Sequence, residues 1–179
     1  MSIINTQLNK SNSELQSKLI SLVGDLQKEP EKANLKFAAK STLKNGFKAD
    51  VTTRDFKFVS DEPHSLGGTD KGPNPVEYVL GALAACQEIV VKAHATALGV
   101  NVTEVQVDVE GDLDLNGLLN LTKARPGFNQ VTFKTTIKTD ETDEEKRKLI
   151  EELTLNNCPV LDTIQNPVSV NAEVTFDNN

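Results

Sequence analysis

The sequence has no tryptophan, one tyrosine, two histidines and two cysteines among its 179 residues. So few histidines and cysteines, with no Cys-x-x-Cys pair, argue against a zinc site. Aromatic residues make up only 4% of the chain, which leaves little for bases to stack on. The net charge of -7 repels a phosphate backbone. We therefore expect neither a metal nor a nucleic acid as a partner.

The sequence also lacks an apolar run of about 18 residues, the length that a membrane-spanning helix needs. Residues 1–10 do not show the charged-then-apolar order of a secretion signal. These absences predict a soluble, cytoplasmic protein with no membrane partner. In that compartment, two cysteines are expected to be free thiols rather than a structural disulfide.

The N-terminal part of the chain predicts an amphipathic helix. Residues 11–28 carry leucines and a valine at helical spacing, and Ser11 with Glu14 has the spacing of a capping box. We expect this helix to form an extension over residues 1–30, attached to a single domain of residues 31–179.

Three strands are predicted next. The sequence Asn45-Gly46 favours a hairpin turn, because both residue types tolerate positive φ. It separates two alternating stretches, residues 34–42 and 47–53. A short strand at residues 56–59 and a Gly- and Pro-rich loop at residues 61–75 follow.

A long helix over residues 75–98 is the centre of the predicted fold. Asn74 and Glu77 have capping-box spacing, and Gly99 suits the position just after the last turn. The helix is apolar nearly all round, which indicates burial on several sides. One face is expected to hold Val79, Ala82, Leu83, Cys86, Ile89, Val90, Ala93 and Ala97.

The remaining elements are strands at residues 102–110 and 131–137, separated by an irregular stretch, and two helices. The first helix covers residues 142–155, with Thr142 and Glu145 as its capping box. The second is short and begins at Pro159. A last strand is expected at residues 168–176. Strands joined by hairpins rather than by helical crossovers predict an α+β fold.

The two cysteines are the candidates for nucleophilic chemistry. A cysteine in mid-helix, as Cys86 is, is by default a small core residue. Cys158 precedes Pro159 as the expected N-cap of a helix, where backbone amides favour an anion, so local electrostatics make it the more acidic thiol. Glu77 lies on the opposite face of its helix from Cys86 and is able to serve only a site on another subunit.

Two motifs add a resemblance to a known family. SDEPHSLGGTDKGPNPVEYVLGALAAC, residues 60–86, and NNCPV, residues 156–160, resemble the two cysteine motifs of the OsmC/Ohr family of osmotically inducible and organic-hydroperoxide-resistance proteins. The resemblance covers about residues 33–176. It implies an intertwined homodimer in which two long central helices pack against antiparallel sheets.

The resemblance also implies an activity, the thiol-dependent reduction of organic hydroperoxides without a cofactor. Cys86 would attack the peroxide, Cys158 would resolve the product as a disulfide, and an external dithiol would reduce both. On this point the family pattern outweighs local electrostatics. Lys44 matches the position of an arginine in the family, and Arg54 is the nearest arginine, so either is a candidate to hold the thiolate. Glu77 would orient that cation across the dimer.

A second hypothesis belongs to another class of function. The altered arginine and glutamate pattern would also suit a non-catalytic dimeric protein that binds a small apolar or acyl ligand in the same pocket. Such a protein would have thiols of ordinary reactivity.

Overall fold

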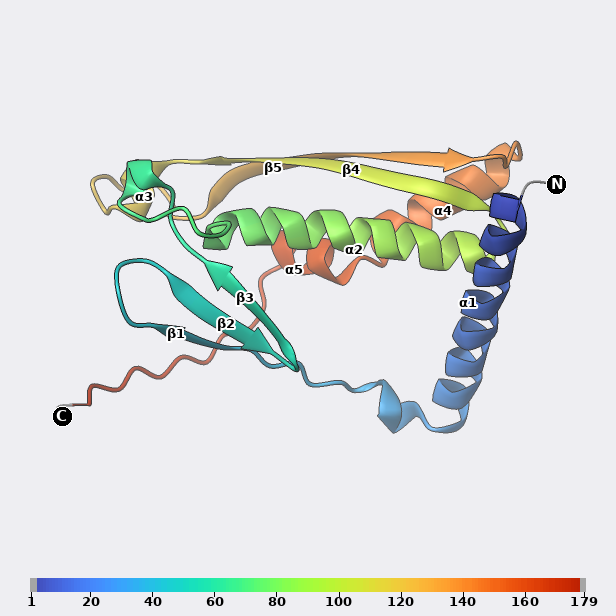
Figure 1. Ribbon diagram of the computed structural model, residues 1–179, viewed down its shortest axis with the longest axis horizontal. Coiled ribbons are helices and arrows are strands. Elements are labelled where there is room, and N and C mark those ends of the chain that lie inside the picture. The colour runs from blue at the N-terminus through green and yellow to red at the C-terminus, as the bar shows by residue number, and fades with distance from the viewer. Residues whose placement is uncertain (1–2, 178–179) are drawn as a thin grey trace.

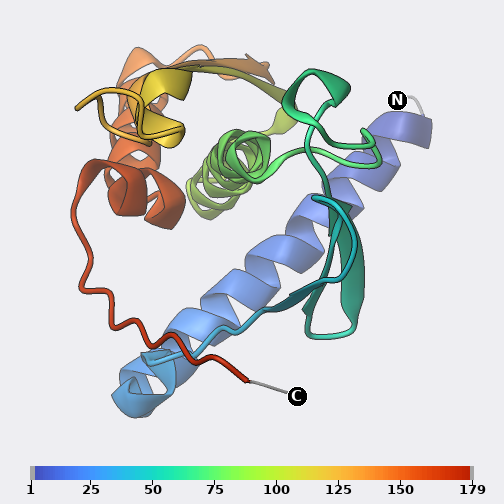
Figure 2. The same cartoon turned by 90° about the vertical axis from the view of Figure 1, so that its left-hand side faces the viewer.

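A computed structural model describes residues 3–177 of the chain, with side chains from Asn12 onward. Helix α2 (Pro75–Ala97) lies along the middle of the molecule, beneath a long antiparallel ribbon of β4 (Val102–Leu113) and β5 (Phe128–Thr139) (Figure 1). Seen along α2, the C-terminal helices cover a second side of it, and a three-stranded sheet lies on another side (Figure 2).

The other elements complete an α+β fold. The three-stranded antiparallel sheet has the order β1-β2-β3, and a short helix α3 lies between β4 and β5. Their bounds are α1 Ile3–Lys28, a 3-10 turn Pro30–Ala33, β1 Lys40–Leu43, β2 Ala49–Thr53, β3 Phe56–Ser60, a 3-10 turn His64–Leu66, α3 Leu115–Leu118, α4 Glu144–Asn156 and α5 Pro159–Gln165.

Helix α2 begins as the sequence predicts. The Asn74 side chain accepts a hydrogen bond from the Glu77 amide at 2.9 Å, and the Glu77 carboxylate accepts one from the Asn74 amide at 2.8 Å. Pro75 occupies the first helical position, where its missing N–H matters least. After the last turn, Gly99 adopts a φ of +71°, a left-handed conformation that favours glycine.

The buried face of α2 differs from the predicted one. The fully buried side chains are Leu83, Gln87, Val91 and Ala95, which follow one another at helical spacing against β4, β5 and the C-terminal helices. In contrast, Ile89 is 69% exposed and Val79 is 40% exposed. Each chain supplies one central helix, so the second central helix of the expected arrangement would come from a second copy.

The β4–β5 ribbon is longer than predicted. An irregular stretch was expected at residues 111–130. That prediction is wrong at both ends of the stretch, because β4 continues to Leu113 and β5 begins at Phe128. Pairs such as Gly111 with Val131 and Asp112 with Gln130 continue the ladder, because backbone hydrogen bonds do not require apolar side chains. The predicted alternation does hold, since Val105, Val107 and Val109 share one half-buried face.

The hairpin of β1 and β2 is confirmed, with a wider loop than a two-residue turn. Leu43 pairs with Ala49, so five residues connect the strands, and Gly46 has a φ of +57°. The predicted strand at residues 34–42 is reduced to β1, because residues 34–39 have no neighbouring strand among the described residues.

Two of the predicted helix caps are wrong. Helix α1 already begins at Ile3, so Ser11 lies inside it and does not cap it. At the start of α4, the side chain of Asp143, not Thr142, accepts hydrogen bonds from the amides of Glu145 and Lys146. Aspartate and threonine are both good caps, and their adjacency leaves the choice open to a one-residue error.

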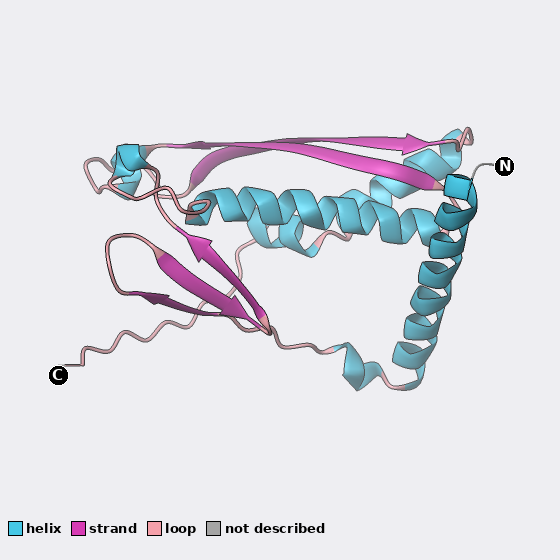
Figure 3. Ribbon diagram, in the orientation of Figure 1, coloured by secondary structure: helices cyan, strands magenta, loops and turns pink. Residues whose placement is uncertain are grey.

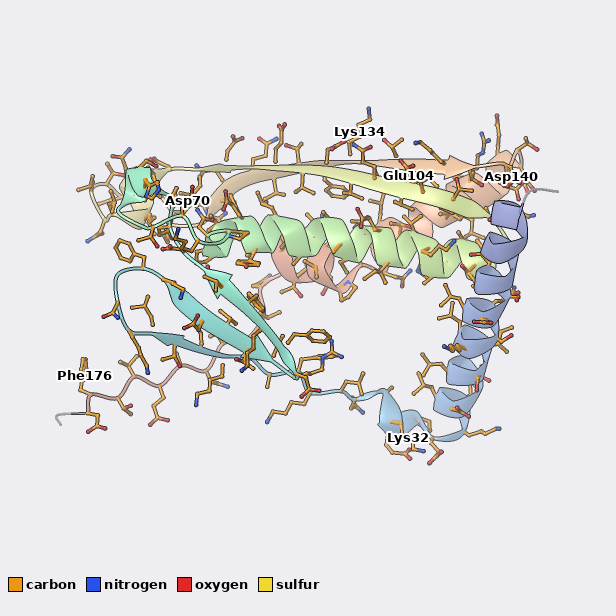
Figure 4. The ribbon with its side chains drawn as sticks, viewed as in Figure 1. Lys32, Asp70, Glu104, Lys134, Asp140 and Phe176 are labelled. Atoms are coloured by element: carbon orange, nitrogen blue, oxygen red, sulfur yellow. The ribbon has the colours of Figure 1, made fainter. Side chains whose placement is uncertain are left out.

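The predicted C-terminal strand is also wrong for the chain taken alone. Residues 168–176 form no strand (Figure 3), and Figure 2 shows this extended segment apart from the three-stranded sheet. Val174 is 79% exposed and Phe176 is 90% exposed, and the Phe176 side chain projects from the end of the segment (Figure 4). An alternating apolar segment needs a neighbouring strand to become part of a sheet, and the described part of this chain offers it none.

Helix α1 lies across the C-terminal end of α2 and runs away from the rest of the chain (Figure 1). Asn12 donates a hydrogen bond to the Asn101 side chain at 2.9 Å near this crossing. No helix within residues 3–177 is both long enough and apolar enough to cross a membrane.

Candidate functional site

The structure brings the two cysteines together. Cys86, half-buried on α2, packs against a buried cluster formed by Leu83, Cys158 and Leu161. The Cys158 side chain lies within hydrogen-bonding reach of Cys86. Both cysteines are free thiols. A long connection through β4, β5 and α4 separates them in the sequence, so only the packing of α5 on α2 creates the pair.

Cys158 is the N-cap of α5, as predicted. Its side chain is 1% exposed, and its sulfur accepts a hydrogen bond from the Leu161 amide at 3.5 Å. Pro159 occupies the first position of the helix. This short helix end therefore fixes the Cys158 sulfur against the face of α2 that carries Cys86.

The surroundings of Cys86 oppose its ionisation. Burial raises the pKa of the Cys86 thiol, and the neighbouring Cys158 raises it as well, whereas a hydrogen bond with the Val160 backbone lowers it. The net effect is a raised pKa, and no lysine or arginine of the described chain contributes to it. A thiol needs a nearby cation or a hydrogen-bond donor to react as a thiolate at neutral pH.

The two candidate cations lie on the separate sheet. Arg54 is in the β2–β3 turn with a φ of +51°, and its guanidinium lies 5.0 Å from the centre of the Phe56 ring. Lys44 lies in the β1–β2 loop and is exposed. Among the described residues, no hydrogen bond or ion pair joins either side chain to Cys86. The Glu77 carboxylate accepts the hydrogen bond of the Asn74 amide in the capping box of α2.

The loop before α2 is held by a buried carboxylate. Asp61 is 1% exposed and accepts hydrogen bonds from the Thr69 hydroxyl at 2.5 Å, and from the backbone amides of Thr69, Lys71 and Glu62. These bonds, with that of the Thr69 hydroxyl the strongest, lower the pKa of Asp61. Within this loop, Gly68 lies so close to Glu62 that an added Cβ would be 1.8 Å from the Glu62 carbonyl oxygen.

An apolar groove lies between the three-stranded sheet and the start of α2. It has a volume of about 600 Å³, within the range of ligand sites. We name it the hairpin groove, and its lining includes Phe47, Val51, Phe58, Tyr78 and Ala82. The Tyr78 hydroxyl donates to the Val59 carbonyl oxygen at 2.6 Å and thereby ties β3 to α2. Ala82 lies one helical turn before Cys86 on α2, and neither cysteine lines the groove.

Sequence reasoning missed Gln87, the residue next to Cys86. It is fully buried, and neither its side-chain nitrogen nor its oxygen has a hydrogen-bond partner among the described residues. The available signal was its position four residues from both Leu83 and Val91, which puts an amide on an apolar stripe of the helix. No group of three or more potential metal-ligating side chains occurs within the described chain.

The comparison with protein families matches residues 68–173, more than half of the chain, to the model of OsmC-like proteins. The chain belongs to the OsmC-like protein family. A comparison with curated protein sequences finds no match. The family and the resemblance drawn from the two cysteine motifs therefore agree.

Solved structures similar to this OsmC-like chain support the same fold. An OsmC-like protein from Mycoplasma pneumoniae is 21% identical, with a TM-score of 0.63 over 74% of this chain and 89% of the other. A protein from Psychrobacter arcticus, described as a putative osmotic stress induced and detoxification response protein, is 15% identical, with a TM-score of 0.59 over 73% of this chain and 89% of that one.

A third structure, from Legionella pneumophila, is described as an organic hydroperoxide resistance protein. It is 20% identical, with a TM-score of 0.54 over 73% of this chain and 90% of its own. At such identities the likeness concerns the fold: antiparallel sheets with long helices, as predicted.

Proposed function

We propose that this OsmC-like protein is a thiol-dependent peroxide reductase that acts on organic hydroperoxides in defence against oxidative stress. The observation that carries the proposal is the contact of Cys86 on α2 with Cys158 at the start of α5. Two free thiols in contact form a unit that is able to pass between dithiol and disulfide. The name of the Legionella protein, an organic hydroperoxide resistance protein, supports the choice of substrate.

The proposed reaction begins at Cys86. Its thiolate attacks the terminal, hydrogen-bearing oxygen of the hydroperoxide, the O–O bond breaks, and the alkoxide leaves and takes up a proton to become the alcohol. Cys86 is then a sulfenic acid. The Cys158 thiol attacks the Cys86 sulfur, the S–S bond forms and water leaves. An external dithiol reduces the disulfide, and no cofactor takes part.

We propose that the protein acts as an intertwined homodimer. The raised pKa of Cys86 calls for a cation, and no lysine or arginine whose side chain the structure describes acts on it. In the dimer, Arg54 or Lys44 of one subunit would hold the thiolate, and Glu77 would orient that cation. Exposed apolar side chains on α2, on the β1–β3 sheet and on the C-terminal segment support a large interface between copies. Residues 1–30 would remain an N-terminal extension to residues 31–179.

Addition of one equivalent of cumene hydroperoxide to the reduced protein is expected to remove two hydrogen atoms from its intact mass. The peptide map should then contain a disulfide between Cys86 and Cys158, because their side chains are already in contact. Hydrogen peroxide, tested in parallel, is expected to react more slowly.

The matched control is Cys158→Ser. It should gain one oxygen at Cys86 and should form no intramolecular disulfide. A wild-type mass that stays unchanged with both peroxides would contradict the proposed activity.

A binding protein is the second candidate, and the hairpin groove is the observation that favours it. The groove is apolar and of ligand size, and no cation among the described side chains lowers the pKa of Cys86. This candidate predicts that a lipid-like molecule co-purifies and is detected by native mass spectrometry. It also predicts thiols that do not consume peroxide.

A further inference from the structure

Helix α1 is attached to the end of α2 by polar contacts and then continues beyond it. Asn12 donates a hydrogen bond to the Asn101 side chain at 2.9 Å. Gln16, one helical turn later, lines the same junction together with Thr96 of α2. From Gln16, α1 continues to Lys28, a further length of about 18 Å at about 1.5 Å per residue. This projecting part runs away from the β4–β5 ribbon, past the other side of α2 (Figure 1 and Figure 2).

The face of α1 that touches α2 becomes apolar where α1 leaves α2. Asn12 and Gln16 occupy this face at the crossing. Leu19, Val23 and Leu26 follow on the same face, because intervals of three and four residues keep side chains on one side of a helix. We name these three side chains the α1 stripe. Leu19 and Leu26 are half-buried, and Val23 is 55% exposed.

The projecting part of α1 needs a surface to pack against. A helical segment of this length is only marginally stable in water by itself, and Gly24 weakens it further. The face opposite the stripe is polar and includes Glu14, Ser21 and Asp25, which suit contact with water. The α1 stripe is therefore the side that another surface would cover.

The exposed side of α2 adjoins the α1 stripe. Thr96, at the junction with α1, lies about two helical turns after Ile89 and on the same side of α2. Ala82 and Ala85, both exposed, lie on this side before Ile89. Tyr78 lies at its other end, where the hydroxyl is bonded to β3. Between Tyr78 and Thr96, an apolar side of α2 about 27 Å long is bounded by the β1–β3 sheet at one end and by α1 at the other (Figure 1).

We propose that the α1 stripe packs against a second copy of this chain seated on the exposed side of α2, so that α1 is an arm that holds its partner. The inference rests on the homodimer of the proposed function, because the copy that covers Ile89 is also the one that reaches α1. The opening of about 27 Å exceeds the diameter of a helix, about 10–12 Å. In a two-fold dimer each copy offers the same surface to the other, so both stripes are covered at once. The match to the family model begins at residue 68, so this contact would add to the common domain.

Val23→Asp is expected to raise the Kd of the dimer at least about tenfold, because it places a carboxylate in the buried interface. Sedimentation velocity at several protein concentrations measures this Kd. Ser21→Asp is the matched control, since it adds the same charge to the opposite, exposed face of α1. It should leave the Kd unchanged.

Hydrogen exchange gives a second measurement that does not depend on the folding of Val23→Asp. The amides of residues 19–28 should exchange at least about tenfold more slowly in the wild-type dimer than in Ile89→Asp, which is expected to be monomeric. The reason is that the projecting part of α1 is packed only in the dimer. Equal exchange of these amides in dimer and monomer would overturn the proposal.

The measured quantities are dimer affinity and exchange, not peroxide turnover, so this inference and the proposed activity can fail separately. A dimer that Val23→Asp weakens but that consumes no peroxide would support the arm and contradict the reductase. An active dimer with the same Kd in Val23→Asp and Ser21→Asp would overturn the arm alone, and this is the result expected if the stripe binds a different protein. A wild-type protein that is monomeric at every concentration would overturn the arm together with the proposed assembly.

Discussion

Replacement of Cys86 by serine is expected to reduce peroxide turnover to the uncatalysed background. A serine hydroxyl in this position has no accessible anion near neutral pH and does not form the sulfenic acid on which the second step depends. Consumption of cumene hydroperoxide in the presence of a dithiol measures the loss. The fold should persist, since Cys86 is only half-buried at the edge of the Leu83, Cys158 and Leu161 cluster.

Two companion variants separate chemistry from packing. Ala84→Ser places the same hydroxyl at another half-buried position of α2 and should retain turnover. Cys158→Ser should still consume the first equivalent of peroxide and accumulate a sulfenic acid at Cys86, which dimedone labels. Normal turnover in Cys86→Ser would show that Cys86 is not the nucleophile.

Ile89→Asp is expected to separate the proposed dimer into monomers. The Ile89 side chain is 69% exposed on the central helix of one chain, and burial of such a side chain is what a second copy would provide. A carboxylate in the centre of an apolar interface weakens association by about 2–4 kcal/mol, the range found for the most important interface residues. Sedimentation velocity at several protein concentrations measures this change.

The same variant tests the origin of thiolate activation. If the cation comes from the second subunit, monomers should titrate Cys86 at a higher pH than wild type and should lose peroxide turnover. Thr136→Asp, at another exposed position, on the outer face of β5, is the matched control and should stay dimeric. A wild-type protein that sediments as a monomer, or an Ile89→Asp variant that remains dimeric and active, would contradict the proposed assembly.

The elements that sequence reasoning predicted well are those with a local signal. The start of α2 follows from Asn74, Pro75 and Glu77, and the hairpin follows from Gly46, because these residues act on their own backbone. The true length of β4 and β5 was missed, since the outer pairs are held by backbone hydrogen bonds between residues with no alternating pattern. The C-terminal segment shows the reverse case: residues 168–176 have the pattern of a strand but no neighbour within the described chain.

In the candidate site, too, some features could be predicted from the sequence and others depend on tertiary packing. The two cysteine motifs identified the pair, and the contact between Cys86 and Cys158 is a result of tertiary packing that no spacing rule contains. The raised pKa of Cys86 follows from its burial, which depends on how α5 packs on α2. Gln87 was passed over because an isolated amide acquires meaning only when the atoms around it are known to leave it unpaired.

Within four residues, helix α2 directs three different side chains to three different sides. This arrangement restricts insertions and deletions in the first half of the helix. Cys86 faces α5, Gln87 is buried beside β5 and α4, and Ile89 faces outward. The capping box at Asn74 fixes where the helix begins, so one inserted or deleted codon before Cys86 would turn all three side chains by about 100° at once. Substitutions can adjust each face separately, but the number of residues from Asn74 to Ile89 has to be preserved. The connection between β4 and β5 can change in length without turning any of them.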